Sequence, residues 1–422
     1  MSVETPNPSP PPRPGAGPSP WPASVPPSPS AVAPLRDGSP APSGQPSGPF
    51  DALARSCASA RGGYAWWYIE AHDLDEGRYG LTLIVFAGSV FSPHYAGRLR
   101  RGDAVCGLDY PAVHFALYER PDGGRHLSHG RLWVMNEYPA SAFFADAHEV
   151  RVGGTRLHYR EGGLDVEIDE HTTRFFSKPG GRVQARLRIQ TDMTMGTGLS
   201  PFCLGENAAG EAHFWQPIAP AATVEVEVKA GGLSRRFAGH AYCDRNCGSG
   251  PLHGTFRRWF WAHGVSAGQK PGALVLYQAQ RLDDSVLGLS VRYPAQPHPA
   301  PDGGAQVSRD EHGGWGGGRG GLADFLWLRV PPRFTVADYQ AERARGSRLE
   351  DAPFYARYAA ELGPAGEHAV SSSERFFGVG EYLDLERFRS PAVQHLLTFK
   401  TRVVEAAPIA PAPPPRDAGP ES

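Results

Sequence analysis

Short runs of residues in which every second side chain is apolar recur along the chain beyond its N-terminal segment. Val183 to Gln190 reads Val-Gln-Ala-Arg-Leu-Arg-Ile-Gln, and Thr223 to Val228 alternates Val with Glu in the same way. Successive side chains of a strand point to opposite faces, so this period of two predicts β-strands with one buried face. The runs Tyr64 to His72, Tyr79 to Val90 and His114 to Glu119 predict further strands because they are rich in β-branched and aromatic residues.

Turn residues separate several of these runs. Glu161-Gly162-Gly163 stands between the strand-like runs Arg156 to Tyr159 and Asp165 to Asp169. Asp283-Asp284 separates two further runs of the same kind. Each arrangement predicts a β-hairpin, in which two neighbouring strands are joined by a tight turn.

The helical period of 3.6 residues is rare in this chain. We expect one helix over Val336 to Arg345 and a short helical turn over Ala359 to Leu362. Many strands at regular spacing, with few helices to cross between them, are typical of barrels and sandwiches rather than parallel sheets. The sequence therefore predicts an all-β protein with two antiparallel barrel-like domains.

Composition sets the limits of these domains. The chain has 422 residues with 42 Pro and 51 Gly, and residues 1–48 are so rich in Pro, Ser, Ala and Gly that they cannot bury a core. We also expect a flexible insertion at Gly313 to Gly321. The predicted parts are a disordered Pro-rich tail at 1–48, an N-terminal domain at 49–222, a C-terminal domain at 223–405 and a loose tail at 406–422, with the join between the domains near residues 215–235.

Charge and cysteine content exclude several classes of protein. The formal net charge of -2 provides no basic stripe, so we expect no nucleic acid partner. Five scattered cysteines are an odd number and indicate a reduced, cytoplasmic compartment rather than a disulfide framework. No secretory signal is expected, and the longest apolar run, around Leu81 to Phe91, is too short to span a bilayer as a helix.

The segment His240-Ala-Tyr-Cys-Asp-Arg-Asn246 carries the first candidate chemistry. In a strand, His240, Tyr242, Asp244 and Asn246 share one face. A carboxyl group in a partly apolar site has a raised pKa, which makes it a proton donor near neutral pH. From this segment alone, Asp244 is equally compatible with a structural role as the cap of the turn that follows.

A second candidate lies in His213-Phe-Trp-Gln-Pro217. His213 and Trp215 share a face by the same argument, and they pair an imidazole that can handle protons with an indole that can stabilise positive charge. As an isolated motif, this segment is also compatible with a packed strand.

Four tryptophans form two close pairs, Trp66 with Trp67 and Trp259 with Trp261. They are candidates for a channel that binds a long apolar ligand, although core packing is the commoner role of tryptophan. The sequence has no dinucleotide fingerprint, phosphate loop, zinc-protease motif or nucleophile elbow. An enzyme with this sequence is therefore expected to work without a metal, nucleotide cofactor or covalent nucleophile.

Taken together, these segments resemble the carotenoid 1,2-hydratase (hydroxyneurosporene synthase) family. The resemblance covers the whole expected folded part, in matching order, through the blocks Tyr64–Ile69, Gly80–Ala96, Trp215–Pro220, Gly239–Asn246, Phe256–Trp261, Glu350–Arg357, Leu385–Phe388 and Pro391–Leu397. The Pro-rich tail, the Gly313 to Gly321 insertion and Phe376 to Gly380 depart from the family pattern.

The resemblance implies two lipocalin-like barrels and a specific reaction. Family members add water across the terminal C1=C2 double bond of acyclic carotenoids such as neurosporene and lycopene, without a redox cofactor, at the photosynthetic membrane. The family's catalytic positions fall on His213, Trp215, Tyr242 and Asp244. Attachment to the cytoplasmic side of that membrane would be peripheral.

The expected mechanism begins with a proton from Asp244, whose carboxyl group Tyr242 positions or reprotonates. Trp215 would stabilise the carbocation, and His213 would orient the attacking water and take its proton. Two alternatives have the same fold: a carotenoid or lipid carrier without chemistry, and an isomerase or cyclase that uses the same acid but excludes water.

Overall fold

The computed structural model describes eleven stretches of the chain, which are residues 50–73, 79–119, 128–173, 181–191, 199–266, 272–294, 305–313, 333–336, 339–343, 354–364 and 375–405. The expected Pro-rich tail, the loose C-terminal tail and the glycine-rich insertion after Gly313 lie outside the described residues.

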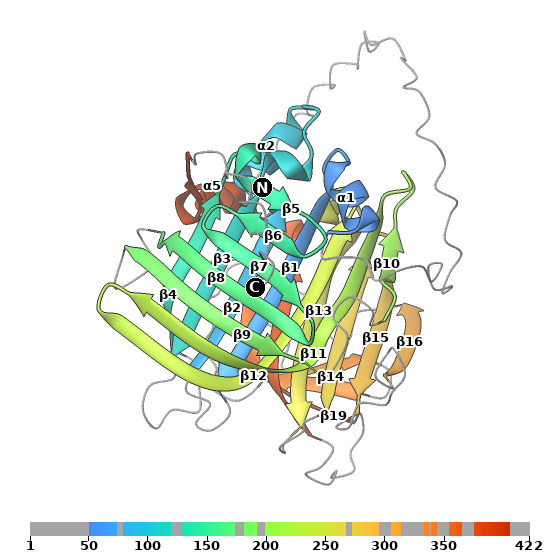
Figure 1. The fold of residues 1–422 in the computed structure, drawn as a ribbon. Coiled ribbons are helices and arrows are strands. Elements are labelled where there is room, and N and C mark those ends of the chain that lie inside the picture. The colour runs from blue at the N-terminus through green and yellow to red at the C-terminus, as the bar shows by residue number, and fades with distance from the viewer. Residues whose placement is uncertain are drawn as a thin grey trace, which may run out of the picture. The chain divides into compact units, whose positions relative to one another are not determined.

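The described strands form two curved sheets, and the fold is the predicted all-β, lipocalin-like one (Figure 1). The larger sheet has thirteen strands in the order β21-β4-β3-β2-β1-β12-β11-β9-β8-β7-β6-β5, with β10 paired to β11. Its strands are β1 (Tyr64–Asp73), β2 (Tyr79–Ala87), β3 (Ala112–Glu119), β4 (Ser128–Glu137), β5 (Phe143–Ala145), β6 (Glu149–Val152), β7 (Thr155–Arg160), β8 (Gly163–His171), β9 (Arg182–Gln190), β10 (Phe202–Glu206), β11 (Ala212–Ala230), β12 (Leu233–Gly248) and β21 (Arg402–Val403).

The smaller sheet has eight strands in the order β16-β15-β14-β13-β20-β19-β18-β17. They are β13 (Phe256–Ser266), β14 (Ala273–Arg281), β15 (Ser285–Tyr293), β16 (Gln306–Gly313), β17 (Arg333–Val336), β18 (Tyr339–Arg343), β19 (Tyr355–Pro364) and β20 (Phe376–Asp384). The described α-helices are α1 (Ala52–Ser59), α2 (Pro93–Arg100), α4 (Leu385–Phe388) and α5 (Pro391–Lys400). None of the helices in the described part of the chain is long and apolar enough to cross a membrane.

The predicted hairpins are confirmed. β7 and β8 pair antiparallel around the Glu161-Gly162-Gly163 turn, where Gly162 has a φ of 68°. β14 and β15 pair around the second turn, where Asp284 adopts a φ of 68°. Such left-handed backbone is tolerated best by glycine, asparagine and aspartate, which explains the residues found there.

Both helical predictions are wrong. In the described part of the first segment, Val336 ends β17 and Tyr339–Arg343 forms β18, while Ala359 to Leu362 lies inside β19. β18 is paired on both sides, with β17 and with β19. Backbone pairing with two neighbouring strands outweighs helix propensities that differ by less than about 1 kcal/mol per residue.

The division of the strands between the two sheets can be set beside the two domains expected from the sequence, which stay a prediction. The chain leaves the larger sheet at Gly248 and enters the smaller one at Phe256, whereas positions 222 and 223 both lie inside β11. β11 continues through them because it pairs with β12 over nearly its whole length. Register shifts between Pro217 and Ala222 accommodate Pro220, which has no backbone N–H to donate to the sheet.

β1 is buried on both faces and separates two apolar cores. Trp67, Ile69 and Ala71 belong to a core enclosed by the larger sheet, whereas Trp66 and Tyr68 belong to a second core that includes residues of both sheets. This double burial explains why β1 reads as a continuous apolar run, while β9, with one face in solvent, alternates strictly. The second core holds the candidate site.

Candidate functional site

The predicted polar row on β12 lies at the centre of the larger sheet, between β1 and β11. Asp244 is opposite Tyr68 of β1 and Pro217 of β11. Asn246 is opposite Trp66 and Trp215 in the same two strands. The register therefore brings the two candidate segments, 213–217 and 240–246, onto one face.

Three hydrogen-bond donors converge on the carboxyl group of Asp244. Trp215 Nε1 donates to Oδ2 at 2.8 Å, and Tyr242 Oη donates to the same oxygen at 2.7 Å. Asn246 Nδ2 donates to Oδ1 at 3.0 Å. Trp215 and Tyr242 have no exposed surface and Asp244 is only 3% exposed, so this network is closed off from bulk water.

Burial raises the pKa of Asp244 to about 7, from an ordinary value of 3.8. Removal from water is the largest cause, because it disfavours the charged carboxylate. The hydrogen bonds from Tyr242 and Trp215 act in the opposite direction, and the nearby carboxyl groups of Glu381 and Glu70 raise the pKa further. Asp244 can therefore carry a proton near neutral pH and still release it.

His213 is fully buried next to this network, with both ring nitrogens engaged. Nδ1 lies 2.9 Å from the hydroxyl of Tyr64, and Nε2 lies 2.8 Å from the hydroxyl of Thr255. Burial lowers the pKa of His213 to about 3, so its ring is neutral at physiological pH. Gly248 leaves room for this ring, because a Cβ there would lie 2.4 Å from Nδ1.

The smaller sheet supplies aromatic rings to the same core. Trp261 of β13 packs edge-on to Tyr68, with ring centroids 5.2 Å apart, and lies 5.1 Å from the ring of Tyr242. Trp259 lies 6.2 Å from Trp66. Three of the four tryptophans singled out in the sequence thus gather around the site.

Trp67 lies apart from them. Its ring belongs to the core enclosed by the larger sheet, where it packs against Phe50 at 5.9 Å. The reason is the alternation of β1, which sends neighbouring side chains to opposite faces.

A buried Glu70–His263 pair lies on the same face and was missed by the sequence reasoning. Glu70 Oε1 is 2.9 Å from His263 Nδ1, and His263 Nε2 is 2.8 Å from the carbonyl oxygen of Pro220. A carbonyl only accepts, so Nε2 must carry a hydrogen. Glu70 and His263 therefore form a buried hydrogen-bonded pair that links β1 of the larger sheet to β13 of the smaller one.

Tyr68 connects this pair to an ion pair. Its hydroxyl lies 3.2 Å from Glu70 Oε2 and 2.8 Å from Glu381 Oε1, and Arg357 donates to the same Glu381 oxygen through Nε at 2.7 Å. Arg357 also donates to the hydroxyls of Tyr118 and Tyr355. The one sequence signal for this network was the polar residue Glu70 within an otherwise apolar strand.

The indole Nε1 of Trp261 is buried and has no hydrogen-bond partner among the described residues. An unmet buried donor is costly, on the order of 1–3 kcal/mol. The ring of Trp261 contacts the rings of Tyr68 and Tyr242, so this donor belongs to the aromatic cluster around Asp244.

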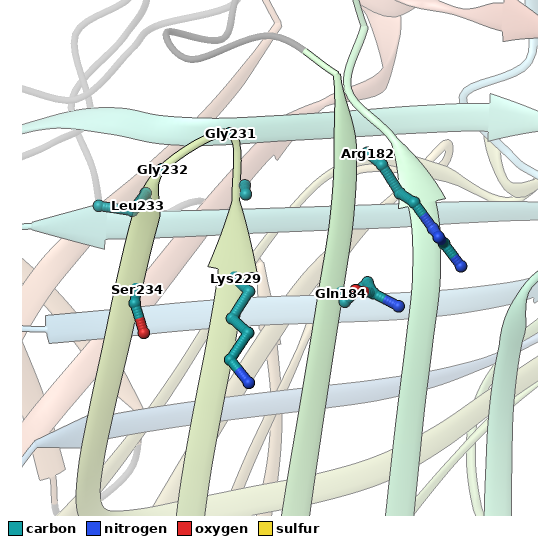
Figure 2. A pocket seen from close by; sticks show the side chains of 8 residues that line it. Arg182, Gln184, Lys229, Gly231, Gly232, Leu233 and Ser234 are labelled. Atoms are coloured by element: carbon teal, nitrogen blue, oxygen red, sulfur yellow. The ribbon is translucent and has the colours of Figure 1, made fainter.

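A surface depression of about 310 Å³ lies elsewhere, at the turn between β11 and β12 (Figure 2). It is lined by Arg182, Gln184, Lys229, Ala230, Gly231, Gly232, Leu233 and Ser234. Its two cations are already paired, Arg182 with Asp169 and Lys229 with Glu227. None of the predicted site residues lines this depression.

In the stretches that the structure describes, no group of three or more His, Cys, Asp or Glu side chains is arranged to hold a metal ion. The immediate surroundings of the Asp244 carboxyl group are its three hydrogen-bond donors and the aromatic side chains of the second core.

The fold and site define a lipocalin-like β protein with a buried acid among packed aromatic side chains. A solved structure described as AttH from Nitrosomonas europaea shares this fold, with a TM-score of 0.50 and 15% identity over 76% of this chain and 92% of that one. The family model described as carotenoid hydratase CrtC matches residues 83–405, and the chain belongs to this family. It is accordingly an enzyme of the hydro-lyase class.

Three similar relatives are each named acyclic carotenoid 1,2-hydratase. The protein from Thiocapsa roseopersicina is 32% identical over 343 residues, which cover 80% of this chain and 73% of its own. The Rubrivivax gelatinosus protein is 30% identical over 326 residues, with coverage of 74% and 68%. The Cereibacter sphaeroides protein is 30% identical over 320 residues, with coverage of 75% and 96%.

Proposed function

We propose that this enzyme adds water across the terminal C1=C2 double bond of an acyclic carotenoid such as neurosporene or lycopene, with Asp244 as the acid and no cofactor. The observation that carries the proposal is the buried carboxyl group of Asp244, which three hydrogen-bond donors hold in an apolar core. The names of the relatives support the substrate class.

An isolated alkene reacts with water only after protonation, so the reaction needs an acid. Oδ2 of Asp244 already accepts two hydrogen bonds, whereas Oδ1 accepts one. The acidic hydrogen is therefore assigned to Oδ1. Its transfer to C2 forms a C–H bond and leaves a tertiary cation at C1, which fixes the position of the hydroxyl group.

Aromatic faces and carboxylate charge stabilise this cation. Trp215 and Trp261 present indole rings to the same core, and a desolvated cation–π contact contributes about 2 kcal/mol. The three donors around Asp244 stabilise the carboxylate that forms at the same moment. Trp215 thus has two roles, through its ring and through its N–H.

Water attacks C1, and its proton returns to the Asp244 carboxylate. The N–H of Trp261, which has no hydrogen-bond partner among the described residues, is the donor that we assign to the attacking oxygen. Overall, one C–H bond and one C–O bond form, while the π bond of C1=C2 and one O–H bond of water break. The O–H bond of Asp244 breaks in the first step and forms again in the last, so Asp244 ends protonated as it began.

His213 has a different role in this proposal from the one expected from sequence. A ring with a pKa of about 3 is a poor base near neutral pH, and both of its nitrogens already have partners. The chain of contacts from Tyr64 through His213 to Thr255 instead fixes β11 and so positions Trp215. Tyr242 holds the carboxyl group of Asp244 in place.

The long apolar substrate would lie along the aromatic residues of the second core. Trp66, Trp259 and Trp261 are the binding candidates, while Trp67 is excluded because it belongs to the other core. A hydrocarbon of this kind is dissolved in lipid, so we place the enzyme in the cytoplasm, attached peripherally to the pigment-bearing membrane.

The test is incubation with lycopene in ¹⁸O-labelled water, for the wild type and for Asp244→Asn. Labelled hydroxycarotenoid from the wild type alone supports the proposal. Unchanged lycopene in both samples indicates a carrier, and a rearranged product without label indicates an isomerase or cyclase.

A further inference from the structure

Helix α5 exposes an apolar stripe to solvent. Ala392, Leu396 and Phe399 follow at intervals of four and three residues, which places them on one side of the helix, and all three are exposed. Leu396 is 49% and Phe399 53% exposed, and Val403 just beyond the helix is 59% exposed. Three of the six large apolar side chains that the described residues expose therefore lie within eight positions. Such clustering marks an interaction surface.

Arginines of α2 and of the α4–α5 turn flank this stripe. α2 and α5 contact each other at one end of the sheets (Figure 1). Arg98, Arg100, Arg101 and Arg389 are exposed. Arg100 and Arg389 both lie near His253. Burial lowers the pKa of His253 to about 4, and the positive charges of Arg389 and Arg100 lower it further.

The local charge differs from that of the whole chain. Asp103 pairs with both Arg98 and Arg101. Glu386 of α4 and Glu405 beyond Val403 are also exposed, so the four arginines, together with Lys400 and Arg402, stand against three carboxylates in this region. The chain as a whole has a formal net charge of -2. The net charge of the whole chain therefore does not attract an anionic surface. Electrostatic attraction to such a surface would come from this group of arginines.

The inner side of α5 closes the core that contains the site. Val393 and Leu397 belong to the same apolar cluster as Trp215 and Tyr242. A row of rings leads from the site towards the helix: Phe86 lies 6.2 Å from Trp66 and 6.1 Å from Phe91, and Phe91 lies 6.2 Å from Phe388 of α4. The short helices α4 and α5 thus both pack against this end of the aromatic core.

We propose that the α2–α5 face, formed by Leu396, Phe399, Val403, Arg98, Arg100, Arg101 and Arg389, docks the enzyme on an anionic lipid bilayer and admits the substrate from it. The combination of exposed apolar side chains with flanking arginines is what interfacial binding to anionic lipids requires. The inference about substrate entry depends on the proposed function, but the docking itself does not.

The experiment compares binding of the full chain to phosphatidylcholine vesicles with and without phosphatidylglycerol, by co-sedimentation. Leu396→Asn/Phe399→Asn is expected to weaken binding about tenfold, because two partly exposed apolar side chains no longer enter the interface. Arg100→Gln/Arg101→Gln is expected to weaken binding to anionic vesicles about fivefold for each arginine, and added salt should do the same. Phe377→Asn is the matched control, because Phe377 is 52% exposed but lies on β20.

Hydration assays separate this inference from the proposed function. If docking admits the substrate, Leu396→Asn/Phe399→Asn loses activity on vesicle-borne carotenoid and keeps it on detergent-dispersed carotenoid. Wild-type binding that is independent of phosphatidylglycerol, or variants that bind like Phe377→Asn, would overturn the docking surface. A wild type that binds anionic vesicles but hydrates carotenoid in neither form would leave the docking surface standing and overturn the proposed function.

Discussion

The substitution Asp244→Asn tests the central feature of the site, which is a carboxyl group kept protonated by burial. The shape of the side chain is conserved. The carboxamide oxygen of the variant can accept from Trp215 and Tyr242 as Oδ2 does, and Asn246 can turn its amide to accept from the new NH₂ group. We therefore expect the variant to fold.

The pKa of Asp244 gives the magnitude and the sign of the effect on stability. The folded-state pKa is about 7, while the unfolded value is close to 3.8. The folded state therefore binds more protons than the unfolded state between these values, and the free energy of unfolding falls as pH rises through this window. Across the whole window, the titration of Asp244 changes the free energy of unfolding by about 4 kcal/mol. About 2.5 kcal/mol of this stability is lost between about pH 5 and pH 8.

The assay is denaturant unfolding of the wild type and the variant at both pH values. Subtracting the variant's pH dependence from that of the wild type isolates Asp244 from all other titrating groups. We expect the wild type to lose about 2.5 kcal/mol more than the variant from the lower to the higher pH. Hydration should fall by roughly 10²–10⁴-fold in the variant, the usual contribution of a general acid.

Two results would refute this reasoning. A pH dependence that differs between the two proteins by less than about 0.5 kcal/mol would mean that Asp244 is ionised in the folded state. Hydration close to the wild-type rate in a folded Asp244→Asn variant would mean that another group supplies the proton.

Further predictions concern the neighbours of Asp244. Trp215→Phe removes a donor that lowers the pKa of Asp244, so the alkaline limb of the hydration–pH profile should move to higher pH; a shift to lower pH would contradict the assignment. Glu70→Gln can donate to His263 through its amide and removes a negative charge that raises the pKa of Asp244, so the same limb should move to lower pH. The control is Glu170→Gln, a buried carboxyl group bonded to Asn136 and Thr155, which should leave the profile unchanged. Burial lowers the pKa of His213 to about 3 from an unfolded value of 6.5, so this residue costs stability as pH falls below about 6.5. In denaturant unfolding, His213→Gln should therefore lose about 2 kcal/mol less stability than the wild type between about pH 7 and pH 5. Equal losses would show that His213 is protonated in the folded protein.

The sequence was sufficient wherever the information was local. A period of two places Tyr242, Asp244 and Asn246 on one face, and the structure joins these three side chains by hydrogen bonds. Turn residues marked the hairpins in the same way, because turn geometry depends on a few adjacent residues.

Tertiary structure decided what the periodicity left open. Trp66 and Trp67 look equivalent in sequence, yet they enter different cores, because β1 has a packed layer on each side. Tyr339 to Arg343 lies in a segment whose residues favour a helix, but pairing with two neighbouring strands makes it strand β18.

The chemical setting of Asp244 also depends on distant parts of the chain. Trp261 and His263 come from β13, and Glu381 comes from β20, which pairs with β13 more than a hundred residues later. Their contacts with Tyr68, Tyr242 and Glu70 form only when the two sheets share a core. The sequence by itself determined which face of β12 carries the acid, whereas the burial that raises its pKa to about 7 exists only in the assembled fold, because desolvation requires both sheets.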